Sequence, residues 1–338
     1  MDKTRRDARA HVGPPVSTAA PESGHDAPTG FLGTTFASLA YRNFVYLWLG
    51  QITHGGALWI DMVARPLLVL SVTDSAVHLG LVMAVRTVPA IALGLFAGVL
   101  ADNFNRRMIL LVTKVVVFAL GTLFALLLFF GLLDLWHIYL FTFLRGATQA
   151  FDQPARRALV PAAVPPHLVT NAMALSSGTV QVMRIVGAGA AGVMIASTGI
   201  AVTFLVVAAF YGAAVYLTWI LRVPDHKRQA YRGVGGIGTD LIQGLKYGWN
   251  DRAVRGILII SAGYFTFGMA FMQVFAPLFA KRVLEIGDSG FGWMMAITGA
   301  GGVAGAFLLA GLNPRTKRGQ VTTALLGILG LLLVAFAL

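Results

Sequence analysis

Long apolar runs follow one another along this chain from residue 44 to residue 338, and most are separated by short polar turns, the exception being the polar segment 223–255. A helix of about 20 residues crosses the hydrocarbon core of a bilayer, and strands are much shorter than these runs. Inside a bilayer the backbone must satisfy its own hydrogen bonds, which a helix does within one segment. The pattern therefore predicts an all-α membrane protein. We expect nine membrane-spanning helices, at 44–72, 77–101, 108–130, 136–155, 168–197, 200–222, 256–280, 290–312 and 321–338.

The composition agrees with this class. Hydrophobic residues make up 57% of the chain and charged residues only 12%, whereas a soluble domain carries about 25% charged residues. Cysteine is absent, which excludes disulfides and thiolate metal sites. The sequence shows no nucleotide-binding glycine loop, catalytic triad or metal-ligand cluster. We therefore expect neither an enzyme nor a cofactor.

The polar segments divide the chain into four parts. Residues 1–43 combine prolines and charges with few large apolar residues, which is typical of a disordered tail. Residues 44–222 hold six expected spans and predict an N-terminal six-helix bundle. Residues 223–255 form a polar linker, in which Asp240 is placed to cap an interfacial helix. Residues 256–338 predict a partial C-terminal bundle of helices seven to nine.

The distribution of basic residues predicts the orientation. With a cytoplasmic N-terminus, the inner segments carry 19 Lys and Arg residues and the outer loops carry 2. Basic residues concentrate on the cytoplasmic side of membrane proteins. We expect a multi-pass protein of the plasma (inner) membrane, with the tail and the 223–255 linker in the cytoplasm. The same bias accounts for the net charge of +12 without a nucleic-acid partner.

Spans two and eight are similar to each other. At a shift of 212 positions Gly80 aligns with Gly292, Ala84 with Ala296 and Arg106 with Arg318. Both helices run in the same direction in the expected topology, as in transporters built from parallel repeats. The chain ends inside an apolar run. We therefore expect a complete first six-helix half and three helices of a second half.

The turn after span two carries a recognisable motif. It consists of Gly98, Asp102, Asn105, Arg106 and Arg107 at the spacing G-x-x-x-D-x-x-N-R-R. This pattern resembles the signature G-x-x-x-D-[RK]-x-G-[RK]-[RK] of the major facilitator superfamily. The signature has glycine where Asn105 stands, and asparagine is the next residue best suited to a left-handed backbone. The resemblance implies the major facilitator fold and a charge network around Asp102 that controls conformation.

Two further stretches are similar to the macrolide-efflux and enterobactin-exporter branch of that superfamily. One follows span four and contains Asp152, Pro154 and Arg156; the other is the glycine- and alanine-rich run 184–192 in span five. That branch has proline where Ala188 stands, so the second element is incomplete. The resemblance covers roughly residues 40–338 and implies export of a small molecule.

Five charged residues lie near the middle of the expected spans: Asp61, Arg65, Arg86, Arg145 and Arg184. An arginine at the bilayer centre costs about 2.5–3.5 kcal/mol on insertion scales. We therefore expect these side chains to face a cavity or one another. Asp61 and Arg65 are four residues apart, share one helix face and are placed to pair. All five are candidates for binding substrate or the coupling ion.

Individual roles follow from these positions. Asp61 is the leading candidate for proton coupling, and Arg86 is predicted to line the central cavity and favour a substrate with an acidic or strongly polar group. A competing interpretation has Arg86 only pairing with Asp61, or binding carbonyls, to hold helices together. We expect His54 to pack or to form hydrogen bonds. Lys114 is expected to extend its ammonium group towards the membrane surface.

These features favour a proton-coupled exporter of a small amphipathic molecule, drug-like or siderophore-like, that works by alternating access in the lipid bilayer. The alternative is a non-transporting membrane receptor or scaffold on the same fold, for which neutral helix interiors would be expected. A permease subunit driven by a separate ATPase is a third possibility, which the parallel repeat and the Gly98–Arg107 motif oppose.

Overall fold

A computed structural model describes residues 36–103, 105–223, 246–264, 268, 271–310 and 318–337. The side chains of 98–103 are not among those described. Over these ranges the chain is helical and contains no strand. The first part comprises the 3-10 helix η1 (Ala37–Ala40), α2 (Arg42–Thr73), α3 (Ala76–Asn103), α4 (Arg106–Phe129), α5 (Leu135–Ala162), the short η2 (Pro166–Leu168) and α6 (Val169–Ile220). The second part comprises α8 (Arg252–Gly263), the π-helical η4 (Phe271–Phe275), α9 (Ala276–Leu278), the π-helical η5 (Phe279–Val283), α10 (Gly287–Ala310) and α11 (Arg318–Ala337).

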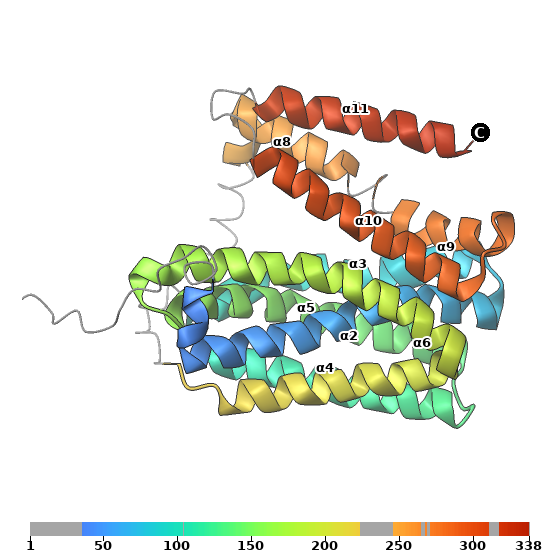
Figure 1. The fold of residues 1–338 in the computed structure, drawn as a ribbon, viewed down its shortest axis with the longest axis horizontal. Helices are drawn as coiled ribbons and strands as arrows, with labels where there is room; N and C mark the ends of the chain where they lie inside the picture. The colour runs from blue at the N-terminus through green and yellow to red at the C-terminus, as the bar shows by residue number, and fades with distance from the viewer. Residues whose placement is uncertain are drawn as a thin grey trace, which may run out of the picture.

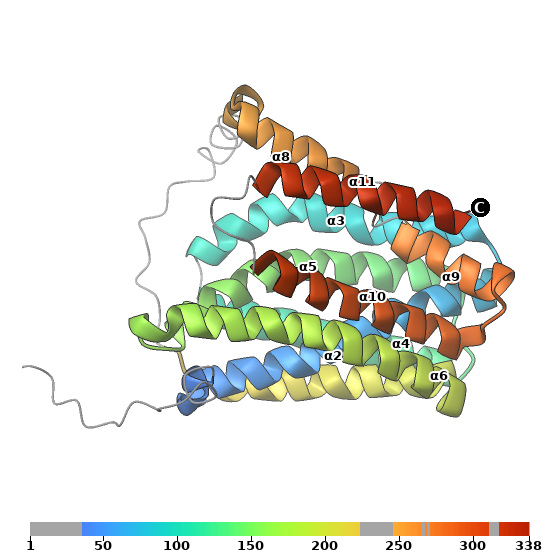
Figure 2. The same ribbon diagram turned by 45° about the horizontal axis from the view of Figure 1, so that its top comes forward.

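The helices run back and forth between two ends of one bundle (Figures 1 and 2). The end where α2 finishes and α3 begins is called here the Asp74 end, and the end where α3 meets α4 is called the Asn105 end. The long helix α6 covers the fifth and sixth expected spans. It breaks at Gly199, which has φ of 84°. Glycine adopts this left-handed backbone readily, so the two limbs of α6 lie antiparallel. The described part of the first half therefore has a helix, or one limb of α6, at each of the six positions where a span is expected.

The segment expected to be a tail is folded at its end. Residues 1–35 lie outside the described residues, but Ala37–Ala40 form η1 and α2 begins at Arg42. The buried Ser38 hydroxyl donates to the Asn171 side chain at 2.6 Å, which holds this turn against α6. The tail boundary at residue 43 was therefore wrong by several residues. The expected interfacial helix after Asp240 falls mostly outside the described residues.

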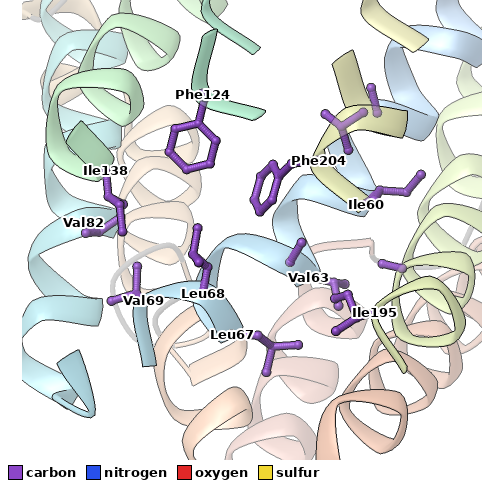
Figure 3. Packing of buried hydrophobic residues seen from close by; sticks show 14 of the residues in the cluster. Ile60, Val63, Leu67, Leu68, Val69, Val82, Phe124, Ile138, Ile195 and Phe204 are labelled. Carbon is purple, nitrogen blue, oxygen red and sulfur yellow. The ribbon is translucent and has the colours of Figure 1, made fainter. Parts of the chain in front are cut away.

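Helix α2 lies in the centre of the first half. Its residues between Gly56 and Leu70 are almost all buried, and it packs most extensively against α6. Figure 3 shows α2 side chains such as Leu68 and Val63 between the rings and branched chains of neighbouring helices. Phe124 of α4 and Phe204 of α6 meet edge to face in the same core, with ring centroids 4.9 Å apart. This apolar core surrounds the buried charges described below.

Close helix crossings depend on particular glycines. A Cβ on Gly292 of α10 would come within 2.8 Å of the Gly192 backbone nitrogen and 3.2 Å of the Ala188 carbonyl oxygen of α6. The small residues Ala188 and Gly192 thus make a tight crossing between the two halves. Other glycines of these helices do not, because Gly94, Gly301 and Gly305 have open space where a Cβ would lie.

Among the described residues, four helical segments are long and apolar enough to cross a membrane: Arg42–Thr73, Ala76–Gly94, Arg106–Phe129 and Pro166–Ile220. Helix α5 is not among them, and it carries the four charged residues Arg145, Asp152, Arg156 and Arg157. Elsewhere large apolar side chains point outward; Ile91 is 69% exposed. A polar α5 surrounded by apolar helices is the arrangement expected when charges face the interior of a membrane bundle.

Candidate functional site

Asp61 is the centre of a buried ion cluster. Its carboxylate lies 2.6 Å from Arg65 Nη2 on the same helix and 2.5 Å from Arg145 Nη1 on α5. All three side chains are at least nine-tenths buried. The predicted pairing of Asp61 with Arg65 is confirmed, and α5 adds a second cation that the spacing within α2 could not reveal.

The two arginines of this cluster are held by further contacts. Arg65 donates to the Thr142 hydroxyl at 3.2 Å, and its guanidinium lies 4.6 Å from the centre of the Phe124 ring. Arg145 donates to the Tyr211 hydroxyl through Nη2, which leaves its Nη1 for Asp61. Charge-assisted hydrogen bonds and cation–π contacts are strong where water is excluded. These contacts therefore hold both guanidinium groups in place around Asp61.

Arg86 belongs to the same region but has a different partner. Its Nη2 donates to the Gln149 side chain of α5 at 3.1 Å, and no carboxylate of the described residues lies within ion-pair distance. Arg86 nevertheless lies near enough to Asp61 to interact with it electrostatically. The interpretation that Arg86 is simply the ion-pair partner of Asp61 is therefore wrong, because Arg65 and Arg145 take up that carboxylate.

Two small cavities adjoin the Asp61 cluster. One, of about 20 Å³, lies among Asp61, Arg65, Arg145 and Tyr211 and is otherwise lined by apolar side chains. The other, of about 10 Å³, is lined by Asp61, Met62, Arg65, Pro66, Met83, Arg86 and Gln273. A single water needs roughly 10–15 Å³, whereas a drug-sized ligand needs about 300 Å³ or more. The described conformation thus has room for water beside Asp61 but not for a large ligand.

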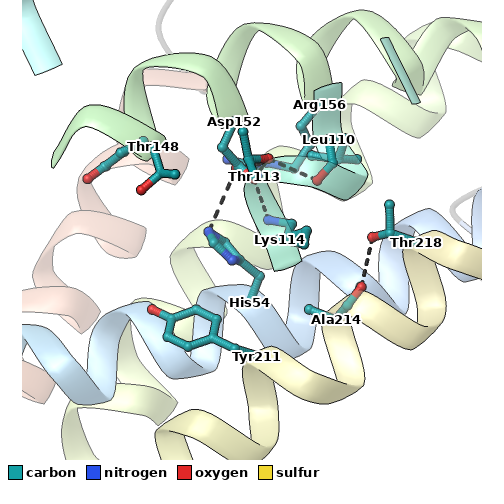
Figure 4. Close-up of polar contacts among 12 residues, drawn as sticks. His54, Leu110, Thr113, Lys114, Thr148, Asp152, Arg156, Tyr211, Ala214 and Thr218 are labelled. Atoms are coloured by element: carbon teal, nitrogen blue, oxygen red, sulfur yellow. Dashed lines mark hydrogen bonds and ion pairs between the residues drawn. The ribbon is translucent and has the colours of Figure 1, made fainter. Parts of the chain in front are cut away.

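A second buried ion cluster surrounds Asp152 (Figure 4). Lys114 Nζ of α4 lies 2.5 Å from the Asp152 carboxylate, Arg156 Nε lies 3.5 Å away, and His54 Nε2 of α2 lies 3.7 Å away. Lys114 is only 2% exposed. The expectation that Lys114 extends to the membrane surface was wrong, because a buried carboxylate on a helix distant in sequence binds it.

Tyr211 contacts residues of both clusters. Its hydroxyl accepts from Arg145, and its ring centre lies 5.4 Å from that of His54, whose Nε2 faces Asp152 (Figure 4). Tyr211, Thr142 and Gln149 were not among the residues predicted from the sequence. A tyrosine near the middle of a mostly apolar span was the available signal for Tyr211, since a buried hydroxyl needs a partner.

Arg184 is separate from these clusters. Its guanidinium lies 5.3 Å from the centre of the Trp59 ring, on the face of α6 that meets α10. A Cβ on Gly302 of α10 would lie 3.6 Å from its Nη1. The structure thus brings four of the five predicted charges together around Asp61 and places Arg184 at the contact between the halves.

The motif after α3 is described only in part. The side chains of Gly98 and Asp102 lie outside the described residues. Asn105 does not adopt the expected left-handed backbone: its φ of −60° and ψ of 110° are extended, and its side chain caps α4 by accepting from the Met108 N–H at 3.1 Å. Asparagine is a favoured N-cap, which explains the difference. Arg107 donates to the Trp219 carbonyl at the end of α6 at 2.7 Å, while Arg106 begins α4 and Pro154 lies within α5.

At the opposite end an arginine of the second half contacts Asp74 of the first. Arg282 Nη2 of η5 donates to the Asp74 backbone carbonyl at 2.6 Å and lies 3.0 Å from its carboxylate. Asp74 presents both groups because it ends α2 in a left-handed conformation, with φ of 44°. Hydrogen bonding from Arg282 and its positive charge lower the pKa of the Asp74 carboxyl. This pair, called here the Asp74–Arg282 latch, was not predicted.

The first half consists of antiparallel apolar helices around buried ion pairs, and the helices of the second half pack against one side of it. This arrangement is typical of a polytopic membrane protein of the transporter type. The model of the transmembrane secretion effector family matches residues 33–338, so the chain belongs to that family of the major facilitator superfamily. The family consists of membrane transporters and not of enzymes. The predicted fold class, superfamily and exporter-like branch are confirmed.

Individual relatives are similar over parts of their length. The chain is 30% identical to a staphyloferrin A transporter of Staphylococcus aureus over 54% of this chain and 43% of that protein. It is 25% identical to the multidrug efflux pump Tap of Mycolicibacterium fortuitum, over 81% and 68% respectively, and 25% identical to macrolide efflux protein A of Streptococcus pyogenes, over 45% and 37%. The matches thus span from about a third to about two thirds of the lengths of these relatives.

A solved structure has the same fold. A bacterial homologue of the human lysosomal transporter Spinster, in an inward-facing and unoccupied conformation, superposes with a TM-score of 0.58 and 17% identity. The match covers 85% of this chain and 65% of that one. At this identity the likeness supports the fold alone.

Proposed function

We propose that the chain is part of a secondary active transporter that exports a small amphipathic molecule by alternating access, coupled to protons through Asp61. The observation that carries the proposal is the Asp61 cluster, in which one buried carboxylate binds two arginines from different helices. Export is supported by the relatives, two of which are named efflux proteins and one a siderophore transporter.

The Asp61 cluster has the chemistry needed to couple protonation to movement. Ionised Asp61 ties α2 to α5 through Arg145. Protonation would remove the negative charge and leave two adjacent guanidinium groups without their shared counterion. In a low dielectric this changes the electrostatic energy of the bundle by several kcal/mol. Such a change is large enough to shift an equilibrium between two conformations.

The orientation predicted from the basic residues places the Asn105 end in the cytoplasm of a plasma-membrane protein. The Asp74 end would then face outward, and the Asp74–Arg282 latch would close that side. A cysteine in place of the exposed Leu132, at the Asp74 end, should react with an impermeant reagent added outside cells, and one in place of Arg222 should not. The reverse pattern would contradict the orientation.

The coupling role of Asp61 is tested by reconstituting the full-length protein in liposomes with a panel that includes a macrolide and staphyloferrin A. We expect an imposed pH gradient to drive transport by the natural protein. Asp61→Asn keeps the shape but cannot be ionised, so it should lose the gradient-driven component while substrate exchange without a gradient persists. Asp134→Asn, at an exposed helix N-cap, is the matched control and should behave like the natural protein. Gradient-driven transport at the natural rate by Asp61→Asn would refute proton coupling through this residue.

A further inference from the structure

The region around Asp61 carries more positive than negative charge. Three guanidinium groups, of Arg65, Arg86 and Arg145, interact electrostatically with this single carboxylate. Arg65 and Arg145 bind Asp61 directly, whereas Arg86 binds the neutral Gln149. A formal surplus of two positive charges therefore remains even when Asp61 is ionised. Uncompensated charge in a low dielectric attracts an ion of opposite sign strongly.

The placement of Arg86 follows from the packing of α3 on α5. Gly146 of α5 has no side chain at the point where the Arg86 backbone carbonyl passes, and a Cβ there would overlap that carbonyl. This close approach puts the Arg86 guanidinium beside Gln149, less than one helical turn beyond Gly146. A guanidinium has five N–H donors, and the one described hydrogen bond of Arg86 uses a single Nη2. Among the described contacts, several N–H groups of Arg86 thus remain available to donate hydrogen bonds to a ligand.

The cavity beside Arg86 lies between the two halves. Asp61, Arg65 and Arg86 line it from α2 and α3, and Gln273 lines it from η4 of the second half. Met62, Pro66 and Met83 make the remaining wall apolar. Transporters of this architecture bind their substrates near mid-membrane between the repeats, and the cavity would widen as the halves separate. Arginine side chains, one amide group and apolar side chains in one cavity fit a ligand with an anionic group and an apolar body.

We infer that Arg86, with Gln149 and Gln273 beside it, binds an anionic group, a carboxylate or a comparable oxyanion, of the transported molecule. The inference rests on the proposed function and adds the substrate class. Arg86 is then a binding residue and Gln149 positions it. The bidentate geometry of a guanidinium suits a carboxylate, which an ammonium group matches less well.

The test compares three probes of the same shape with the full-length protein in lipid nanodiscs at pH 7: 2-naphthoate, the neutral 2-naphthamide and the cationic 2-naphthylmethylammonium. Isothermal titration would measure binding. We expect 2-naphthoate to bind at least about tenfold more tightly than the amide, the effect of one charge-assisted hydrogen bond. Arg86→Gln should remove this preference, and Arg86→Lys should keep its direction at reduced strength. Arg222→Gln removes an exposed arginine and should change nothing.

Equal affinity for the three probes, no binding of 2-naphthoate, or an anion preference that persists in Arg86→Gln would overturn the inference. If Arg86→Gln does not fold, the probe preference of the natural protein and of Arg86→Lys decides. The outcome is independent of proton coupling, which is tested with Asp61→Asn and a pH gradient. A protein that transports by proton coupling without preferring anions would refute only this inference.

Discussion

At the scale of single residues, the buried charges that the structure describes in the first half have definite partners. Asp61 binds Arg65 and Arg145, Asp152 binds Lys114, and Arg86 binds Gln149. A buried ion pair contributes little net stability over apolar replacements, but breaking one leaves a desolvated charge. In the Asp152 cluster, removing one member of the Lys114–Asp152 pair should therefore destabilise the protein more than removing both members.

Lys114→Met should destabilise the protein by about 3 kcal/mol, because it removes the nearest cation from buried Asp152 and leaves only the more distant Arg156 and His54. Thermal unfolding in detergent micelles would measure the loss. The double variant Lys114→Met with Asp152→Leu should recover part of it, since neither of these two charges then remains uncompensated, although the partly exposed Arg156 loses its carboxylate partner. A single variant as stable as the natural protein would show that the Lys114–Asp152 pair is not formed.

At the scale of helices, glycine sets how closely neighbouring elements pack. Gly146 lets α3 approach α5 at Arg86, and Gly292 lets α10 approach α6 at Gly192. Small residues are used in this way in membrane bundles, where close backbone approach supplies the packing energy. A spacing of small residues is not sufficient, since Gly301 and Gly305 face open space in the described structure.

Gly146→Ala should destabilise the bundle by about 1–3 kcal/mol, because its methyl group would overlap the backbone carbonyl of Arg86, which cannot move without displacing α3. Unfolding in micelles would again provide the measurement. Gly178→Ala, on α6 with open space around it, is the control, and it should be neutral or stabilising by up to about 1 kcal/mol. Equal effects of the two changes would argue against the close crossing at Arg86.

At the scale of the whole molecule, the two halves meet along α6 and α10 and at the Asp74–Arg282 latch. The latch is exposed, so its contribution to folding is small. We expect it to act instead on the equilibrium between conformations in which the Asp74 end is closed or open. The chain has no cysteine, so spin labels can be placed at chosen sites without background.

Labels on cysteines at Val77 and Val283, both exposed, should report a short distance at pH 7. Arg282→Gln should lengthen that distance or broaden its distribution, whereas Lys281→Gln, which removes a neighbouring charge, should have little effect.

The Asp74–Arg282 latch lowers the pKa of the Asp74 carboxyl. The latch is therefore fully formed at pH values above the usual pKa of aspartate, and it is lost as the pH falls through the lowered pKa. The distance should therefore stay constant from pH 8 to pH 5 and increase only below about pH 4. A change between pH 7 and pH 5, or none in Arg282→Gln, would contradict the role of the latch.

The sequence by itself determined the class of fold, the helical segments of the first half and the Asp61–Arg65 pair. Hydropathy and i, i+4 spacing are local properties, and they do not depend on how helices are arranged. Only the tertiary structure decided that Arg145 joins Asp61, that Lys114 binds Asp152 and that Arg86 binds Gln149 instead of Asp61. These partners are on different helices, and Arg86 and Gln149 are 63 residues apart. Which face of one helix meets another is set by packing over its whole length, at places such as Gly146, and a local pattern does not contain that information.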